Sequence, residues 1–468
     1  MTAAARRRDG VGPGPPAHGS YRVLLAVTVV FFALASLSDG ARALLPLPGP
    51  AVFYGRYALA GLLVLATWGQ APGGARPLAD AAPMSRWIVR GSYALAVIAL
   101  ASTAWSIAPA QTAQQAAAYL MLGAVLHGLT ACRWHHREVA LGDLAAVVRP
   151  LAAMVALGLV GARIGLVTAD AHSGRHHGVF ANANTLGMLA ALVAATSAGL
   201  FLHRRSAWAA GAVVVCVYAI LLAQTRTAIL ALAAAGLWLI LRRGARSAVT
   251  AGVVAALAGL GVAMSGLAPE RLPGPAGRLA QRFSGDAPSG VLSGRGTTWD
   301  LTLQLWHQRP VTGYGFRTGE LVIAVQGPAA GYESDVIGNS FLQVVLELGL
   351  LGVVPFGILL FALLGVARRA PVSGGGAGLV AGCVVGLCVA FTESALLGTG
   401  QAFCWLVWLV AAAGAASGPA PPRADRRRSW GRPTVAPAWV LPADGRQNPE
   451  SSRIARSGHL PGARGWAR

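Results

Sequence analysis

Apolar stretches long enough to cross a bilayer recur along nearly the whole of this chain. A membrane-spanning helix needs about 20 mostly apolar residues, and only 12% of the 468 residues are charged. A large soluble helical protein would need polar helix faces that these stretches lack. We therefore expect an all-α polytopic membrane protein. Its twelve candidate spans are 21–38, 51–69, 87–106, 113–132, 145–163, 184–203, 206–223, 226–242, 247–268, 346–367, 377–394 and 397–416.

The placement of charge orients these spans. Every basic residue other than histidine is arginine, and in membrane proteins such residues are in excess in the cytoplasmic loops. With the N-terminus inside, +20 of the formal net charge of +21 falls on the two tails and the inside loops. Both termini are predicted to be cytoplasmic, with one large outer loop, 269–336, between spans nine and ten. Because the positive charge gathers on the predicted cytoplasmic side of the membrane, it is explained by topology, and no nucleic-acid partner is expected.

The chain divides into a core and two tails. Residues 21–416 form the predicted transmembrane core, including the outer loop. Residues 1–20 and 417–468 are rich in Arg, Gly and Pro without a helical period. That composition is typical of disorder, so both are predicted to be disordered cytoplasmic tails.

The outer loop contains one predicted helix. Residues 297–308 have a helical pattern that Pro310 ends. Trp299, Leu303 and Trp306 lie on one face of this helix. That face suits a position at the membrane interface or packing on the span ends, and the pattern leaves both readings open.

Three arginines lie on the predicted outer side of the membrane. They are Arg175 before the sixth span, Arg226 at the start of the eighth, and Arg295 in the large loop. An arginine beside a bilayer, away from the cytoplasmic face, needs a partner. A planar guanidinium matches the oxygens of phosphate or carboxylate, so the sequence favours an anionic ligand. The alternative for each is an arginine that lies at the membrane interface or pairs within its loop.

Five stretches recur in order between about residues 100 and 400. They are S-T-A-W-S-I-A-P at 102–109, R-x-x-G-x-F-x-N-x-N at 175–184, T-R-T at 225–227, R-x-x-x-W with R-P and G-x-G at 295–315, and G-N-S-x-L-Q-x-x-x-E-x-G at 338–349. Together they resemble the O-antigen ligase and polymerase family, bacterial membrane enzymes that join or polymerise lipid-linked glycans. The ligases have a histidine directly before the Asn of the last stretch, thought to activate the acceptor, where this chain has Gly338.

The resemblance implies a donor glycan held on polyprenyl diphosphate and a glycan or lipid-glycan acceptor, with membrane lipids around the protein. Arg226 and Arg295 would then act catalytically on the departing diphosphate, because fixed cationic donors stabilise developing charge. Arg175, Asn184 and Asn339 would bind the diphosphate or the glycan. No cofactor and no metal are expected, since the histidines and acids show no ligand spacing.

A hydroxyl acceptor also calls for a general base. Glu347 and Glu393, acids within or at the end of apolar spans, are the preferred candidates, because such acids are by default functional or paired. The other candidates on the predicted outer side are His172, His176, His177, His307, Glu333 and Asp335.

The sequence thus predicts a glycosyltransferase of the cytoplasmic (inner) membrane that assembles surface polysaccharide on the outer face. Polymerase is preferred over ligase because the ligase-type histidine is missing at Gly338. The alternative is a polytopic transporter or a flippase for lipid-linked glycan. Such a protein would show charges inside several spans and related halves, whereas these charges gather at one membrane face.

Overall fold

The computed structural model describes residues 18–38, 41, 48–69, 77–164, 175–243, 295–326 and 336–417. These residues are helical apart from their connections. The α-helices are α1 (His18–Leu34), α3 (Gly49–Gly69), α4 (Pro83–Ala101), α5 (Pro109–Gly128), α6 (Arg137–Arg163), α7 (Ala183–Arg204), α8 (Ala207–Ala223), α9 (Arg226–Arg243), α12 (Arg295–Gln308), α13 (Gly319–Gln326), α14 (Ser340–Arg369), α15 (Gly375–Thr392) and α16 (Ala402–Ala416).

Eleven of the predicted spans coincide with helices, and 247–268 lies outside the described residues. Seven of the described helices are long and apolar enough to cross a membrane, and three shorter ones are also apolar. The protein is a multi-pass membrane protein. The total of twelve spans, the cytoplasmic termini and the outer loop placement stay predictions. Most of both predicted tails lies outside the described residues.

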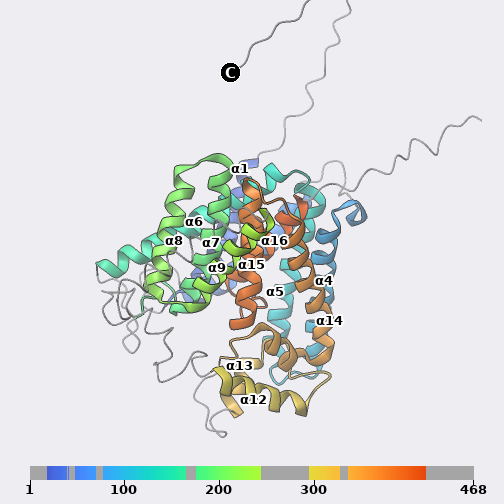
Figure 1. The fold of residues 1–468 in the computed structure, drawn as a ribbon. Helices are drawn as coiled ribbons and strands as arrows, with labels where there is room; N and C mark the ends of the chain where they lie inside the picture. The colour runs from blue at the N-terminus through green and yellow to red at the C-terminus, as the bar shows by residue number, and fades with distance from the viewer. Residues whose placement is uncertain are drawn as a thin grey trace, which may run out of the picture. The chain divides into compact units, whose positions relative to one another are not determined.

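The helices pack side by side, and α12 and α13 lie across one end of the bundle, beyond α5 and α14 (Figure 1). We call this the α12 end. Small residues permit close packing within the bundle. A Cβ at Gly199 of α7 would lie 2.4 Å from the Cα of Gly378 in α15, so the two backbones touch where these helices cross.

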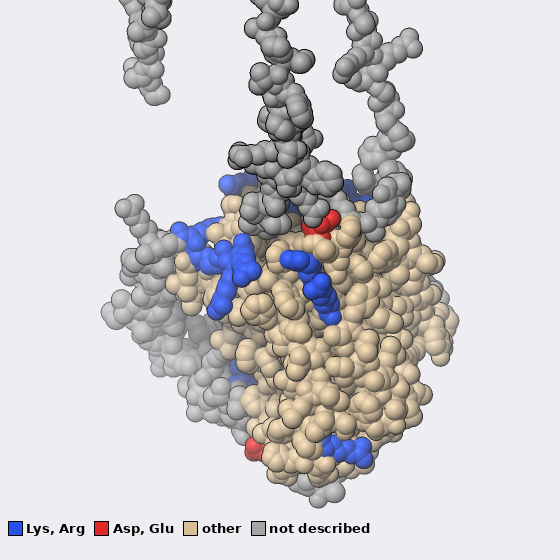
Figure 2. Space-filling model, turned by 90° about the vertical axis from the view of Figure 1, so that its right-hand side faces the viewer, with Lys and Arg blue, Asp and Glu red and all other residues tan. Residues whose placement is uncertain are grey.

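The bundle surface is apolar over a broad belt. Figure 2 shows most arginines of that face toward the end opposite α12, with few charged side chains between them and the α12 end. Large aliphatic side chains point outward, among them Leu65 at 70%, Val354 at 67% and Leu157 at 65% exposure. Such a belt would be unfavourable in water and suits lipid.

The last predicted span, 397–416, begins too early. Helix α16 starts at Ala402, and residues 393–401 are non-helical although most of them are buried. Their carbonyls are paired with side chains: Gly400 accepts from Arg56 Nη1 at 3.1 Å, and Thr399 accepts from Trp405 Nε1 at 3.1 Å. Irregular backbone at membrane depth is tolerated where protein satisfies it. We call 393–401 the buried turn.

The helix predicted at 297–308 is α12, but a different face packs. Its buried residues are Thr298, Leu301, Thr302 and Leu305, and Leu303 is exposed. The neighbouring Trp299 donates its indole N–H to the Ile337 carbonyl at 2.9 Å. The predicted stripe therefore lies beside the packing face, because its indoles bind backbone carbonyls and the aliphatic side chains fill the contact.

A turn after α12 ties the loop to the bundle. Trp105 Nε1 donates to the Thr312 carbonyl at 2.9 Å, and the Tyr314 hydroxyl lies 3.0 Å from Gln308 Oε1. Burial raises the pKa of Tyr314, which the Arg309 guanidinium partly opposes. The hydroxyl therefore stays a proton donor at neutral pH, and the turn keeps its anchor.

The predicted topology can be checked with reporter fusions. A reporter after Gly285 in the predicted outer loop and one after Gly418 at the C-tail should report opposite sides of the membrane. The charge partition along the chain is the reason, since arginines concentrate on the cytoplasmic side. Two reporters on the same side would contradict the assignment.

Candidate functional site

Four side chains of the predicted site meet in one hydrogen-bonded chain. Arg295 Nη2 donates to Glu393 Oε1 as an ion pair. Asn184 Nδ2 donates to the same oxygen at 3.1 Å, and Arg175 Nη2 donates to Asn184 Oδ1 at 2.6 Å. We call Arg175, Asn184, Arg295 and Glu393 the Arg–Glu network. It joins two predicted arginines through one carboxylate.

The ends of three helices position this network. Asn184 lies in the first turn of α7, where Asn182 caps the helix by accepting from the Thr185 N–H at 2.8 Å. Arg295 is the first residue of α12, and Glu393 follows the last residue of α15. Helix ends leave backbone groups unpaired, so polar side chains gather there. The Glu393 side chain is 8% exposed and that of Arg295 23% exposed.

Arg226 lies at the same end of the bundle. It begins α9, directly after Thr225, whose hydroxyl donates to the Ala183 carbonyl at 3.0 Å and lies 3.4 Å from Arg175 Nη2. Arg175 Nε also donates to the Ala223 carbonyl at 3.0 Å. The turn between α8 and α9 therefore packs directly against Arg175, which brings all three predicted arginines into one region.

The side chain of Asn339 makes structural contacts. Its Oδ1 accepts from the Phe341 and Leu342 N–H groups at 2.9 and 3.1 Å, which caps α14. Its Nδ2 donates to the Phe391 carbonyl at 3.1 Å. The amide oxygen of Asn339 is fully used by these contacts, so a predicted substrate contact from Asn339 would come from the second N–H of its amide nitrogen. Its clearest role is to hold α14 against the end of α15, beside Glu393.

Sequence reasoning missed the neighbour of Asn339. The Ser340 hydroxyl donates to the Glu393 carbonyl at 2.7 Å and so fixes the backbone of the buried turn. The available signal was its position directly after Asn339, in the stretch that resembles the family. Ser340 holds Glu393 in place without touching its carboxylate.

Glu347 lies in a different setting. It is 1% exposed and accepts from the Arg317 N–H at 2.8 Å, the Gly319 N–H at 3.3 Å and Gln343 Nε2 at 2.9 Å. None of these donors is shared with Glu393. Glu347 therefore ties the start of α13 to α14, and these contacts favour a structural role over the predicted catalytic one.

Replacing Glu347 by alanine should lower the stability of the folded protein. Three donors, two of them buried, would lose their acceptor, at about 1–3 kcal/mol for each buried donor left unsatisfied. Thermal unfolding of the purified protein in detergent measures the loss. Glu138→Ala is the matched control, because that side chain is 61% exposed. Unchanged stability together with lost activity would instead support the predicted catalytic role of Glu347.

His177 and His307 do not join the network through their described contacts. His177 Nδ1 lies 2.6 Å from the Phe180 carbonyl, and His307 Nδ1 lies 3.0 Å from the Leu303 carbonyl on the exposed side of α12. His172, Glu333 and Asp335 fall outside the described residues. Among the residues that the structure describes, no group of three or more His, Cys, Asp or Glu could hold a metal ion.

Gly338 occupies the position of the ligase histidine and lies against Arg295. Its φ of +60° is in the left-handed region, which favours glycine. A Cβ there would lie 3.1 Å from Arg295 Nε and 3.3 Å from Arg295 Cδ. A histidine on this backbone would therefore press on the arginine that binds Glu393. The glycine leaves room for the Arg295 side chain.

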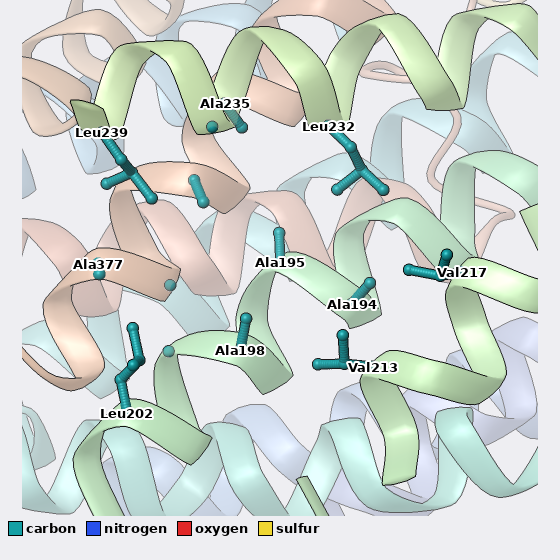
Figure 3. A pocket seen from close by; sticks show the side chains of 14 residues that line it. Ala194, Ala195, Ala198, Leu202, Val213, Val217, Leu232, Ala235, Leu239 and Ala377 are labelled. Carbon is teal, nitrogen blue, oxygen red and sulfur yellow. The ribbon is translucent and has the colours of Figure 1, made fainter. Parts of the chain in front are cut away.

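An apolar groove of about 180 Å³ opens between α7, α8, α9 and α15 (Figure 3). Its lining includes Ala194, Ala198, Leu202, Val213, Val217, Leu232, Leu239 and Ala377. Ala194 lies about 15 Å further along α7 than Asn184, at 1.5 Å per residue. The groove has no charged lining residue and is separate from the Arg–Glu network.

Comparison with known protein families supports the resemblance. No curated protein matches the chain. A family model described as O-antigen ligase matches residues 211–357, a region that includes Arg226, Arg295, Gly338 and Glu347. Arg175 and Glu393 lie outside the matched region and reach it through the Arg–Glu network. The match confirms the resemblance seen in the motifs over residues 211–357 and supports an O-antigen ligase/polymerase-like family.

Proposed function

We propose that this protein is a membrane glycosyltransferase that extends a glycan carried on polyprenyl diphosphate, at the outer face of the cytoplasmic membrane. The observation that carries the proposal is the meeting of Arg175 and Arg295 in one network, with Arg226 beside it. These cations lie at the α12 end of a bundle of membrane helices. A lipid-linked diphosphate is an anion that reaches such a place.

The chemistry follows from charge. The acceptor hydroxyl oxygen bonds to the anomeric carbon of the donor sugar while the bond from that carbon to the diphosphate oxygen breaks. The electron pair stays on the diphosphate, where guanidinium groups stabilise it. The acceptor proton passes to a carboxylate. Glu393 is the preferred base because it lies among the arginines, whereas Glu347 already accepts from three donors of the fold.

Polymerisation is preferred over ligation. Gly338 has no proton acceptor where the ligases have histidine. Sugar transfer passes through an oxocarbenium-like transition state. Most of the stabilisation that this state needs is therefore at the leaving group and not at the base. The arrangement also favours an enzyme over a transporter. Transporter sites lie near the bilayer midplane between repeats, and this network lies at helix ends.

Deletion of the gene in its native host tests the function. Surface polysaccharide should be lost or shortened to single repeat units, and lipid-linked units should accumulate. Wild-type protein and the control variant Glu138→Gln should both restore long chains. An unchanged polysaccharide with no change in the lipid-linked pool would overturn the proposal.

A further inference from the structure

A carboxylate of the protein already occupies the proposed anion site. Glu393 Oε1 accepts from both Arg295 and Asn184, and Asn184 Oδ1 accepts from Arg175. The network therefore contains two cations and one anion. An incoming anion that binds Arg295 must compete with Glu393 for the same guanidinium.

Two further contacts fix the backbone of Glu393 independently of its carboxylate. Its N–H donates to the Val389 carbonyl at 2.8 Å, and its carbonyl accepts from the Ser340 hydroxyl at 2.7 Å. Both bonds survive a rotation of the side chain. The Arg295 side chain runs past Gly338, which has no side chain to block it. The backbone bonds of Glu393 therefore do not depend on its ion pair with Arg295.

We propose that Glu393 is an internal counter-anion, which the diphosphate of the donor displaces from Arg295. The inference rests on the proposed function. A diphosphate offers several oxygens and more charge than one carboxylate, so it is the stronger partner for a guanidinium. In the empty protein the ion pair keeps the arginines together. On binding, Arg295 turns to the diphosphate, and the Glu393 carboxylate becomes free beside the reacting sugar.

The proposal has a signature that a purely structural ion pair lacks. Glu393→Gln removes the competing charge but keeps an amide oxygen that can accept from Asn184. Diphosphate should then bind more tightly, whereas polysaccharide formation should fall because the carboxylate is gone. If Glu393 only maintained the fold, the same change would weaken binding as well.

The test is a titration of the purified full-length protein in detergent with inorganic diphosphate at constant salt. Glu393→Gln and Glu393→Ala should each bind about tenfold more tightly than the wild type, equivalent to about 1.4 kcal/mol. Glu138→Gln removes a carboxylate from a His203–Arg204 contact near the far end of α7 and should bind like the wild type. In an Arg295→Ala background, Glu393→Gln should have a much smaller effect, and the difference measures the coupling between the two residues in a double-mutant cycle.

The outcomes separate the two proposals. Wild-type protein that binds diphosphate while both Glu393 variants bind equally or less tightly overturns the counter-anion alone. Failure of both variants to fold does the same, because it makes Glu393 a structural residue. If the deletion strain keeps its polysaccharide and the wild type binds no diphosphate, both the proposed function and the counter-anion role of Glu393 are overturned.

Discussion

Arg295→Ala and Arg226→Ala are each expected to stop glycan assembly while the protein stays folded in the membrane. Arg295 contacts Glu393 directly, and Arg226 follows the turn that packs on Arg175. Loss of one preordered donor to developing negative charge costs about 100- to 1,000-fold in turnover. Polysaccharide made from a lipid-linked donor by membranes with equal amounts of protein measures the effect.

Lysine should be a poor substitute at either position. It keeps the positive charge but loses the planar pair of donors that a diphosphate engages. The matched control is Arg204→Ala, which removes an arginine that is 59% exposed at the other end of α7. At 1.5 Å per residue, it lies about 30 Å from Asn184 along that helix, and activity should be kept. Full activity in both the Arg226 and the Arg295 alanine variants would discard the anion site.

The length of the apolar stretches predicted most of the helices, because a membrane-spanning helix must match the thickness of the bilayer. The error at 397–416 has a physical cause. Residues 397–401 were read as the start of a span, but they are not helical, and the Gly400 carbonyl there accepts from Arg56 of the distant helix α3. Such tertiary pairing has no signal in local composition.

The sequence singled out the members of the Arg–Glu network but gave no signal of their contacts. Arg175, Asn184, Arg295 and Glu393 were each singled out, yet their meeting depends on how α7, α12 and α15 end together. Glu347 and Glu393 looked alike in the sequence as acids near apolar spans. Only the fold separates them, since one accepts backbone N–H groups and the other an arginine.

The sequence contained a helix N-cap signal at Asn339 that the prediction did not use. Asn directly before an apolar helical run is a favoured N-cap, and Asn339 caps α14 in this way. Resemblance to the family pointed to substrate binding, while local chemistry pointed to a helix start. Gly338, by contrast, was noted as a departure, and its contact with Arg295 now gives that departure a steric reason.

The second large effect is expected from replacing Glu393, the proposed general base. Glu393→Ala is expected to lower turnover at least 100-fold, within the range that a general base contributes. The variant in which His172, His176, His177 and His307 are all replaced by glutamine should keep most of its activity. His177 and His307 lie against backbone carbonyls, and neither makes a described contact with Glu393.

The same membrane assay decides between acid and histidine. Turnover is compared at equal protein level in the membrane for wild type, Glu393→Ala and the quadruple-histidine variant. An inactive quadruple variant beside an active Glu393 variant would refute the assignment and place the base among the four histidines. Because Gly338 has no proton acceptor, an active wild type with both variants active would mean that departure of the diphosphate runs ahead of deprotonation. The arginines would then carry the catalysis, and solvent would take the proton.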